Sequence, residues 1–418
     1  MAKFVDVLDL SDLGVQDYST FTLKSNPFPS MGLPDDIPAT MADRKEIILR
    51  FKSALADCVN TGNSSVTVLT GDYGSGKTHL LRYFKYKVND QLFHLTSKNR
   101  VLAIYVKSVG ISVVNLFKYF MDDVSRYFLA DIAIKEINNY LAQQDETKIK
   151  SYIYDKELKT KYNKKTKLDE YLRGSRFYDL FKDIRKEVFA KISSDDFVYA
   201  LLHLAHPDYS QIAWRWFLCE DLEKDSRKMI LLDNNITERQ QVLDIFNGVI
   251  SLLLQSGLKS IVVLIDEFEN ITQISKTARD RYFDDIRHLL DENRKGVCFV
   301  IASTYTGFDA VTQSQSALTR RFARDYKLEK FDLDNINELI KQYLALYRLQ
   351  NSGLEQKVKT LTDTSVDIYP FTNKAINLIF EKTTGVVHYI IDVCRESIEL
   401  AIQSNSTVID EKIIEKIK

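Results

Sequence analysis

The segment that most constrains the fold is Gly71-Asp72-Tyr73-Gly74-Ser75-Gly76-Lys77-Thr78, which fits the pattern GxxxxGK[ST] in full. It follows a β-branched run of strand type, SSVTVLTG, and precedes a helical pattern from Lys77 to about Val88. In that context glycines let successive backbone N–H groups cradle phosphate oxygens, and the helix N-terminus adds its positive dipole end. We expect residues 71–79, ending at His79, to bind a nucleotide, with Lys77 at the β- and γ-phosphates and Thr78 at Mg²⁺.

A second run, Ile261–Ile265, is wholly apolar and ends in Asp266-Glu267. Such a run predicts a strand buried on both faces, and its carboxylates emerge where ligands of parallel sheets bind. We expect Asp266 to hold the water shell of Mg²⁺ and Glu267 to polarise the attacking water as general base. Glu269 is a lesser candidate for a catalytic acid, and we expect it to act rather as a salt-bridge or cap residue.

Hydroxyl side chains follow a third apolar run, Val297–Ala302, after a predicted helix. Ser303 and Thr304 stand where a polar group on the strand beside Asp266 can orient water or sense the γ-phosphate. Serine and threonine at a strand end are also ordinary turn residues, so both interpretations stay open.

Three arginines, Arg320, Arg321 and Arg324, precede the last predicted strand, Tyr326–Phe331. An arginine in this position can reach the γ-phosphate of a neighbouring subunit and stabilise the charge that is transferred, with Arg321 the first candidate. A solvated basic helix end is the alternative.

Short apolar runs that alternate with helical patterns predict an α/β fold with a parallel sheet. We divide the chain into an extended N-terminal arm (1–40), two core parts (41–125 and 240–331), a mainly helical insertion (126–239) and a helical lid (332–418). Four of the six prolines fall between residues 27 and 38, which excludes a helix interior there. The predicted helices include about 41–59, 239–255 and 279–292.

Composition excludes several classes of protein. The net charge is −1 and the pI about 6.6, so any contact with nucleic acid must come from a local patch. Four separated cysteines without a CxxC pattern argue against a disulfide framework or zinc site. The apolar runs are too short to span a bilayer, and the acidic N-terminus is unlike a signal peptide, so we expect a cytoplasmic protein without a membrane contact.

A basic stretch lies inside the insertion. From Lys148 to Lys191 there are 14 Lys and Arg against 7 Asp and Glu, a local excess of 7 positive charges, interleaved with aromatic residues. Such a stretch can bind DNA by neutralising phosphates and stacking bases, or it can be a solvated surface that docks a partner protein. His203 and His206 are three apart, but without a third ligand nearby we expect core or capping histidines.

Together these motifs resemble those of AAA+ ATPases, over roughly residues 26–125 and 239–418. The resemblance implies a P-loop NTPase sheet with a C-terminal helical lid, ATP and Mg²⁺ as ligands, and a homo-oligomer. The family's lid usually supplies a sensor arginine, where this chain has His388. The Asn26-Pro27-Phe28 arm with Asp43-Arg44 is similar to the base-contacting segment of Orc/Cdc6-like ATPases, which implies a nucleotide contact for Arg44. Unlike those origin-binding relatives, the chain is expected to have no winged helix after the lid.

A narrower resemblance is to the ATP-binding proteins of bacteriophage exclusion (BREX) systems. It is carried by GDYGSGKTHLLRYF, the long insertion, Ile212-Ala213-Trp214-Arg215-Trp216 and VVLIDEFENI. The expected function is a Mg²⁺-dependent ATPase that acts as a nucleotide-controlled switch or assembly factor on DNA, in antiviral defence, replication or transposition. The alternative is a slow-turnover ATP-binding scaffold that recruits a partner protein.

Overall fold

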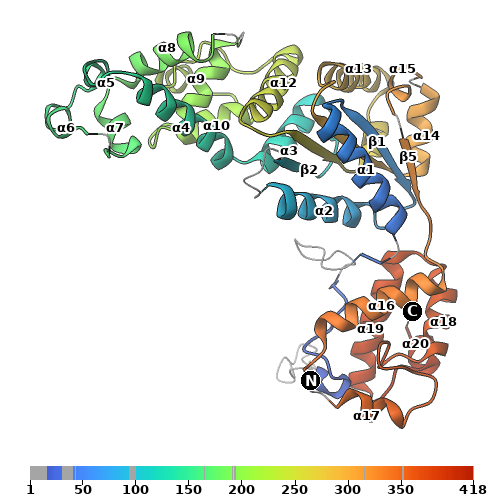
Figure 1. The fold of residues 1–418 in the computed structure, drawn as a ribbon. Coiled ribbons are helices and arrows are strands. Elements are labelled where there is room, and N and C mark those ends of the chain that lie inside the picture. The colour runs from blue at the N-terminus through green and yellow to red at the C-terminus, as the bar shows by residue number, and fades with distance from the viewer. Residues whose placement is uncertain are drawn as a thin grey trace, which may run out of the picture. The chain divides into compact units, whose positions relative to one another are not determined.

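The computed structural model describes residues 17–30, 41–42, 44–93, 100–163, 165–190, 192, 194–314, 316–322, 324–350 and 353–417 (Figure 1). These residues form two compact units. One contains the described part of Met1–Ile48, with Gly71–Tyr83 and the described part of Leu328–Lys418. The other contains Leu49–Thr70 and the described part of Phe84–Lys327.

A five-stranded sheet in the order β2-β3-β4-β1-β5 forms the centre of the second unit. The pairs β1–β4, β2–β3 and β3–β4 are parallel. β3 and β4 are buried along their whole length, as their unbroken apolar runs predicted. The strands are β1 (Ser65–Gly71), β2 (Val101–Val106), β3 (Ser260–Ile265), β4 (Val297–Ser303) and β5 (Arg324–Leu328). The predicted α/β parallel sheet is confirmed.

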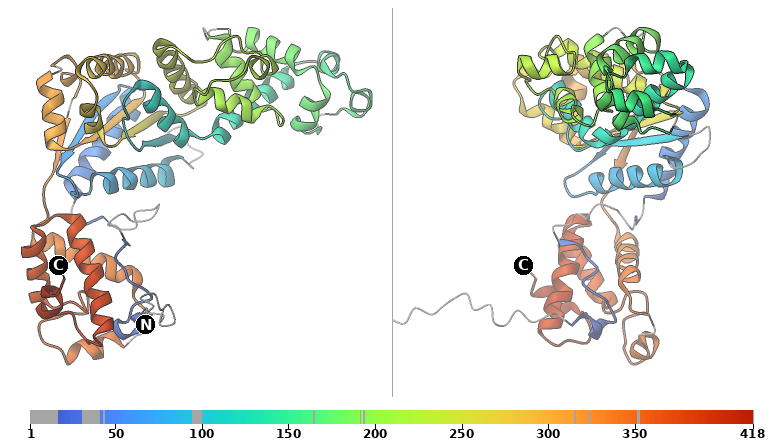
Figure 2. Two further views of the ribbon diagram at one scale, coloured as in Figure 1. Left: turned by 180° about the vertical axis from the view of Figure 1, so that it is seen from behind. Right: turned by 90° about the vertical axis from the view of Figure 1, so that its left-hand side faces the viewer.

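Helices cover both faces of this sheet (Figures 1 and 2). The chain runs from β1 to β2 in one direction across the sheet and from β2 through β3 to β4 in the other. Since such crossovers are right-handed, the helix after β1 lies on the face opposite to the helices between β2 and β4. The core helices are α1 (Lys45–Thr61), α2 (Lys77–Val88), α3 (Val113–Val124), α12 (Arg239–Gln255), α13 (Lys276–Glu292), α14 (Tyr305–Ser314) and α15 (Ser316–Thr319).

Several predicted boundaries shift: α13 begins at Lys276 rather than at residue 279, the last strand begins at Arg324 rather than Tyr326, and for two other shifts the contacts give a reason. The last strand ends at Leu328 instead of continuing to Phe331. The backbone beyond it bonds elsewhere: Glu329 O accepts from Arg44, and Phe331 N–H donates to Gly385 O at 2.9 Å. The first helix begins at Lys45 rather than Met41 and runs to Thr61 rather than Val59. At its C-terminal end, Gly62 N–H donates to Cys58 O.

The described residues between 126 and 239 form helices joined by turns, which agrees with the expected helical insertion. Their apolar faces share one core with α3 and α12, in which Trp216, Phe181 and Phe217 are buried. The helices are α4 (Arg126–Gln143), α5 (Glu146–Tyr152), α6 (Lys156–Lys161), α7 (Leu168–Gly174), α8 (Phe177–Glu187), α9 (Asp195–His203), α10 (Ser210–Phe217) and α11 (Lys224–Met229).

The C-terminal helices pack around a separate apolar core in the first unit. They are α16 (Leu333–Tyr347), α17 (Leu354–Lys359), α18 (Asn373–Thr383), α19 (Val387–Gln403) and α20 (Glu411–Glu415). The described part of the N-terminal arm joins them: Tyr18–Phe21 form a short 3-10 helix, and Phe28 is fully buried against Tyr343 and Phe371. In this part, the arm is a component of the lid core rather than a free extended segment.

Candidate functional site

The loop between β1 and α2 has the backbone of a phosphate cradle. Gly74 and Gly76 adopt φ values of +74° and +92°, which favour glycine. The hydroxyl of Ser75 is buried and has no hydrogen-bond partner among the described residues. A side chain at position 74 would lie 3.0 Å from Val386 Cγ1, so this turn also packs against the lid. A buried hydroxyl without a partner, next to two glycines with positive φ, fits an anionic ligand.

Lys77 begins α2 and is only 8% exposed. Its Nζ donates to Gly71 O at 2.8 Å and to Asp72 O at 3.0 Å, and it lies 5.8 Å from the centroid of the exposed Tyr73 ring. The ammonium is thus held over the loop by backbone carbonyls. Thr78 and His79 follow it, half-buried, in the first turn of α2.

Arg44 is buried and connects the loop to the chain segment that enters the lid. One terminal nitrogen donates to Ser75 O at 3.3 Å and to Glu329 O at 3.0 Å, and the guanidinium lies 4.8 Å from the Phe331 ring centroid. We expected a nucleotide contact for Arg44, and the structure adds an architectural role that the sequence pattern did not indicate. Its predicted companion Asp43 lies outside the described residues.

In the lid, His388 stands where the AAA+ family usually has a sensor arginine. Its turn contacts the phosphate loop. The backbone N–H of His388 donates to Gly74 O at 3.2 Å. Its imidazole Nε2 is 3.2 Å from Asp392 Oδ2, one helical turn further along α19. The side chain is therefore oriented along its own helix by a carboxylate.

Asp266 follows β3 directly and is 2% exposed. Both carboxylate oxygens accept hydrogen bonds: Oδ1 from the Glu267 N–H and Oδ2 from the Tyr105 hydroxyl, each at 2.9 Å. Tyr105 belongs to the neighbouring strand β2, and our sequence reasoning missed it. The only available signal was a hydroxyl near the end of an otherwise apolar strand.

Glu267 is exposed and has the left-handed backbone conformation φ 50°, ψ 43°, which a non-glycine residue rarely adopts. Its Oε2 accepts from Asn270 Nδ2 at 2.9 Å, and the same amide nitrogen donates to Ser108 Oγ at 3.0 Å. Strained backbone of this kind collects at functional sites. The general-base candidate is thus held by an amide that the sequence did not single out.

Ser303 ends β4, is fully buried, and its hydroxyl has no partner among the described residues. Thr304 is different, because its N–H and its Oγ1 are both engaged at the start of α14. Of the two predicted hydroxyls, that of Ser303 is the one without a hydrogen-bond partner among the described residues.

The sheet register brings these residues to one edge. Thr70, which precedes the loop, pairs with Ser303 across β1 and β4, and Ile265, which precedes Asp266, pairs with Ile301 across β3 and β4. The carboxyl ends of three neighbouring parallel strands thus carry the loop, the hydroxyl and the acidic pair.

Arg321, the first arginine-finger candidate, is half-buried in an ion pair. Its Nε donates to Asp291 Oδ1 at 2.9 Å and a terminal nitrogen to Oδ2 at 2.6 Å. These bonds lower the pKa of Asp291 and raise that of Arg321. Arg320 is exposed, and the side chain of Arg324 lies outside the described residues.

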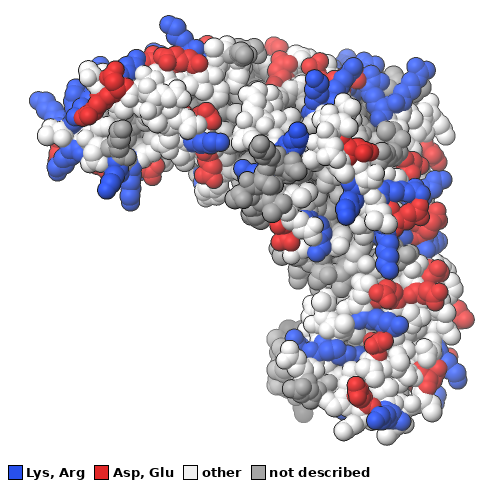
Figure 3. All heavy atoms as spheres, in the orientation of Figure 1, with Lys and Arg blue, Asp and Glu red and all other residues white. Residues whose placement is uncertain are grey.

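The described residues of the insertion mix acidic with basic side chains, and some of its aromatic side chains are buried. Three of its aromatic side chains, Tyr152, Tyr171 and Phe177, are buried in the core. Figure 3 shows Lys and Arg interleaved with Asp and Glu over this part of the surface. Six of its basic residues form ion pairs: Lys148–Asp183, Lys150–Glu146, Lys161–Glu157, Arg173–Asp208, Arg176–Asp179 and Arg185–Asp195.

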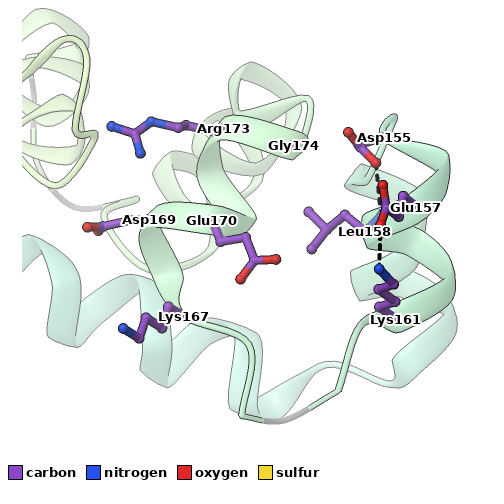
Figure 4. Close-up of a pocket in the computed structure, with 9 residues that line it drawn as sticks. All are labelled: Asp155, Glu157, Leu158, Lys161, Lys167, Asp169, Glu170, Arg173 and Gly174. Carbon is purple, nitrogen blue, oxygen red and sulfur yellow. Dashed lines mark hydrogen bonds and ion pairs between the residues drawn. The ribbon is translucent and has the colours of Figure 1, made fainter.

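A groove of about 580 Å³ between α6 and α7 carries the same mixture of charges (Figure 4). Glu170 points into the gap between the two helices, facing Leu158 and the Glu157–Lys161 pair. Asp155 and Asp169 also line it. Carboxylates on both sides would repel a phosphate backbone, so this groove does not favour DNA.

His203 and His206 are core residues, as expected. Both are buried among Phe177, Phe181 and Tyr209, and His203 Nδ1–H donates to Tyr199 O at 2.7 Å. In the described part of the chain no group of three or more His, Cys, Asp or Glu side chains is arranged to hold a metal. No helix there is both long and apolar enough to cross a membrane.

A parallel sheet of this order, with a GxxxxGKT loop after β1 and an acidic pair after β3, defines a P-loop ATPase fold of the AAA+ type. Within that class the chain resembles the family described as "BREX system ATP-binding protein BrxC/D", whose model matches residues 186–393. The match includes Asp266, Glu267 and Ser303, while the GxxxxGKT loop precedes it. The family resemblance expected from the motifs is thereby confirmed.

Individual relatives are more distant. An uncharacterized HTH-type transcriptional regulator of Methanocaldococcus jannaschii is 25% identical over 163 residues, 39% of this chain, and the match spans only 36% of that relative. The ORC2 protein of Aeropyrum pernix, solved as ADPNP-ADP complexes, has a TM-score of 0.48 at 11% identity, over 92% of this chain and 69% of that one. Drosophila ORC bound to DNA has a TM-score of 0.45 at 10% identity, over 99% and 69%.

Proposed function

We propose that the protein is a Mg²⁺-dependent ATPase whose nucleotide state controls its assembly or its binding to a partner. The observation that carries the proposal is the order of β1, β4 and β3, which are neighbours in one parallel sheet. The GxxxxGKT loop follows β1, Ser303 ends β4 and Asp266-Glu267 follow β3, so each strand ends in a group of the required chemistry. The match to an ATP-binding family supports the same ligand.

The chain's own residues have distinct roles in this proposal. The amides of residues 71–78 bind the phosphates, and Lys77 exchanges its carbonyl partners for phosphate oxygens. Thr78 and Asp266 would hold Mg²⁺, which neutralises charge on the phosphates when it is bound. Glu267 takes a proton from the attacking water, and the orphaned Ser303 hydroxyl orients that water or the γ-phosphate.

In this proposal, Arg321 links ATP hydrolysis to the assembly of several copies of the chain. A homo-oligomer in which this residue faces the nucleotide of a neighbouring copy would complete the site, at the cost of its ion pair with Asp291. DNA is proposed as a ligand of the assembly rather than of the insertion, in which six of the 14 Lys and Arg residues from Lys148 to Lys191 form ion pairs. A role in antiviral defence in the cytoplasm rests on the family match.

The test is steady-state ATP hydrolysis by the full chain with and without double-stranded DNA, using Glu267→Gln as the blank. Turnover that this substitution and Lys77→Ala both abolish supports an ATPase, and stimulation by DNA supports the DNA-linked switch. Equal rates in the wild type and Lys77→Ala refute the enzyme. Equal rates of hydrolysis with and without DNA refute the DNA link and leave a protein as the proposed partner.

A second candidate is a slow-turnover ATP-binding scaffold that recruits a protein partner. Two observations favour it: Asn270 holds the Glu267 carboxylate, and His388, bound to Asp392, stands where the family places an arginine. ATP that stays bound through purification, with negligible turnover, would identify this case. Rapid loss of ATP with turnover would exclude it.

A further inference from the structure

Glu269 fastens the turn that carries Glu267 to the end of strand β4. It lies in the 3-10 helix Phe268–Gln273 and is only 9% exposed. Its Oε2 accepts the backbone N–H of Thr304 at 3.1 Å. Thr304 Oγ1 in turn accepts the N–H of Gly307 at 3.1 Å, which completes the cap of α14. One carboxylate therefore joins the segment after β3 to the segment after β4.

Gly307 makes this joint tight. A Cβ at position 307 would lie 2.4 Å from Glu269 Cβ, 3.1 Å from its Cα and 2.9 Å from Thr304 Oγ1. Non-bonded carbon atoms do not approach to 2.4 Å, so any larger residue would push the first turn of α14 away from the 3-10 helix. The absence of a side chain at Gly307 is what permits the direct contact.

The two residues that flank the joint are the ones on which hydrolysis depends. Glu267 lies two residues before Glu269 and enters the turn with its strained backbone. Ser303 lies one residue before Thr304, with its orphaned, buried hydroxyl. Backbone that is fixed at Glu269 and Thr304 leaves little freedom at either neighbour.

We propose that Glu269, with Gly307, is a positioning residue that sets the spacing between the Glu267 carboxylate and the Ser303 hydroxyl. The inference rests on the proposed ATPase function and adds a residue to it. Neither Glu269 nor Gly307 needs to touch the nucleotide. A shift of Ser303 on contact with the γ-phosphate moves Thr304 and, through the hydrogen bond from Thr304 to Glu269, the backbone that carries the general base.

Positioning and simple helix capping predict different results. Loss of a cap lowers stability and leaves the turnover of the folded protein unchanged. Loss of positioning lowers kcat without weakening ATP binding, because a displacement of about 1 Å can reduce a rate by about 100-fold. Glu269→Gln keeps a carbonyl oxygen that can accept from Thr304, whereas Glu269→Ala removes it.

The experiment compares Glu269→Gln, Glu269→Ala and Gly307→Ala with the wild type for kcat, for affinity to a non-hydrolysable ATP analogue and for thermal unfolding. We expect kcat to fall about 10- to 100-fold in Glu269→Ala and Gly307→Ala, with analogue affinity within about twofold, and Glu269→Gln to retain most turnover. Ser275→Ala is the matched control, since Ser275 caps α13 in the same unit by accepting from Ala278 N–H. It should unfold at a lower temperature with unchanged kcat.

Each outcome decides a different claim. Wild-type kcat in the folded Glu269→Ala and Gly307→Ala proteins overturns the positioning role and leaves the ATPase intact. A parallel loss of kcat and analogue affinity overturns it as well, because that pattern indicates a damaged binding site. Wild-type turnover no higher than that of the Glu267→Gln blank refutes the ATPase proposal itself, and the positioning role with it.

Discussion

Arg44→Lys tests whether the phosphate loop depends on its attachment to the lid segment. Arg44 spans two backbone carbonyls, of Ser75 and Glu329, while its planar face covers the Phe331 ring. Lysine keeps the charge, but its side chain is shorter and lacks the planar group that both reaches these carbonyls and stacks on the ring. The substitution therefore removes at least one buried hydrogen bond and most of the stacking.

The magnitude follows from these contacts. The Ser75 bond is long, 3.3 Å, so its net contribution is about 0.5–1.5 kcal/mol, which corresponds to about a 2- to 12-fold loss of ATP affinity. The Glu329 bond and the ring contact, about 1–3 kcal/mol together, contribute to the stability of the fold rather than to ATP binding.

The assay is a calorimetric ATP titration together with urea unfolding. Arg50→Lys is the matched control, because Arg50 lies in α1, which begins one residue after Arg44, and it also stacks on a ring, that of Tyr326, with 5.6 Å between guanidinium and centroid. We expect weakened ATP binding in Arg44→Lys alone. Wild-type ATP affinity and an unchanged urea midpoint in Arg44→Lys would refute the reasoning.

Three further predictions concern other contacts. Asn270→Ala should raise kcat about 2- to 12-fold, because the hydrogen bond from Asn270 holds the Glu267 carboxylate away from the attacking water. A fall in kcat at unchanged stability would show that this hydrogen bond positions the general base instead. Burial lowers the pKa of His203 to about 3. Between pH 6.5 and 3, a proton therefore binds this histidine in the unfolded chain but not in the folded one. The free energy of unfolding falls with decreasing pH as a result, by about 2 kcal/mol at pH 5. Urea unfolding of His203→Gln should show a shallower pH dependence, and parallel curves would contradict this. Asp291→Asn should free Arg321 and raise specific activity at low protein concentration, while Arg321→Ala should abolish any dependence on concentration; equal activity in all three proteins would exclude an arginine finger.

The elements nearest the site could be predicted from sequence because their signals are local. Helices α2 and α12 have the predicted bounds and strand β3 has them to within one residue, since apolar runs and periodic patterns end there at polar residues or glycine. The acidic pair after β3 and the loop after β1 follow from the same patterns. The sheet order then places them at one edge.

The contacts that tune the site could not be predicted in this way, because they join residues far apart in sequence. Tyr105 and Asp266 are separated by 161 positions, and Arg44 and Glu329 by 285. The charge count for the insertion has the same limit. Three of the acids that pair with its basic residues, Glu146, Asp195 and Asp208, lie outside the stretch in which charges were counted.

The insertion occupies the connection between two strands that are neighbours in the sheet. Its ends leave the core through α3 and α12, which pack against each other where Phe117 and Phe120 meet Phe246 at centroid distances of 5.2 and 4.6 Å. Because both anchors stand side by side, the whole segment can lengthen, shorten or be exchanged in evolution without disturbing strand order. A force applied to the insertion also has a short route inward, since α12 leads directly into β3 and so to Asp266. The insertion and the strand that precedes Asp266 are therefore joined by one short, continuous run of chain.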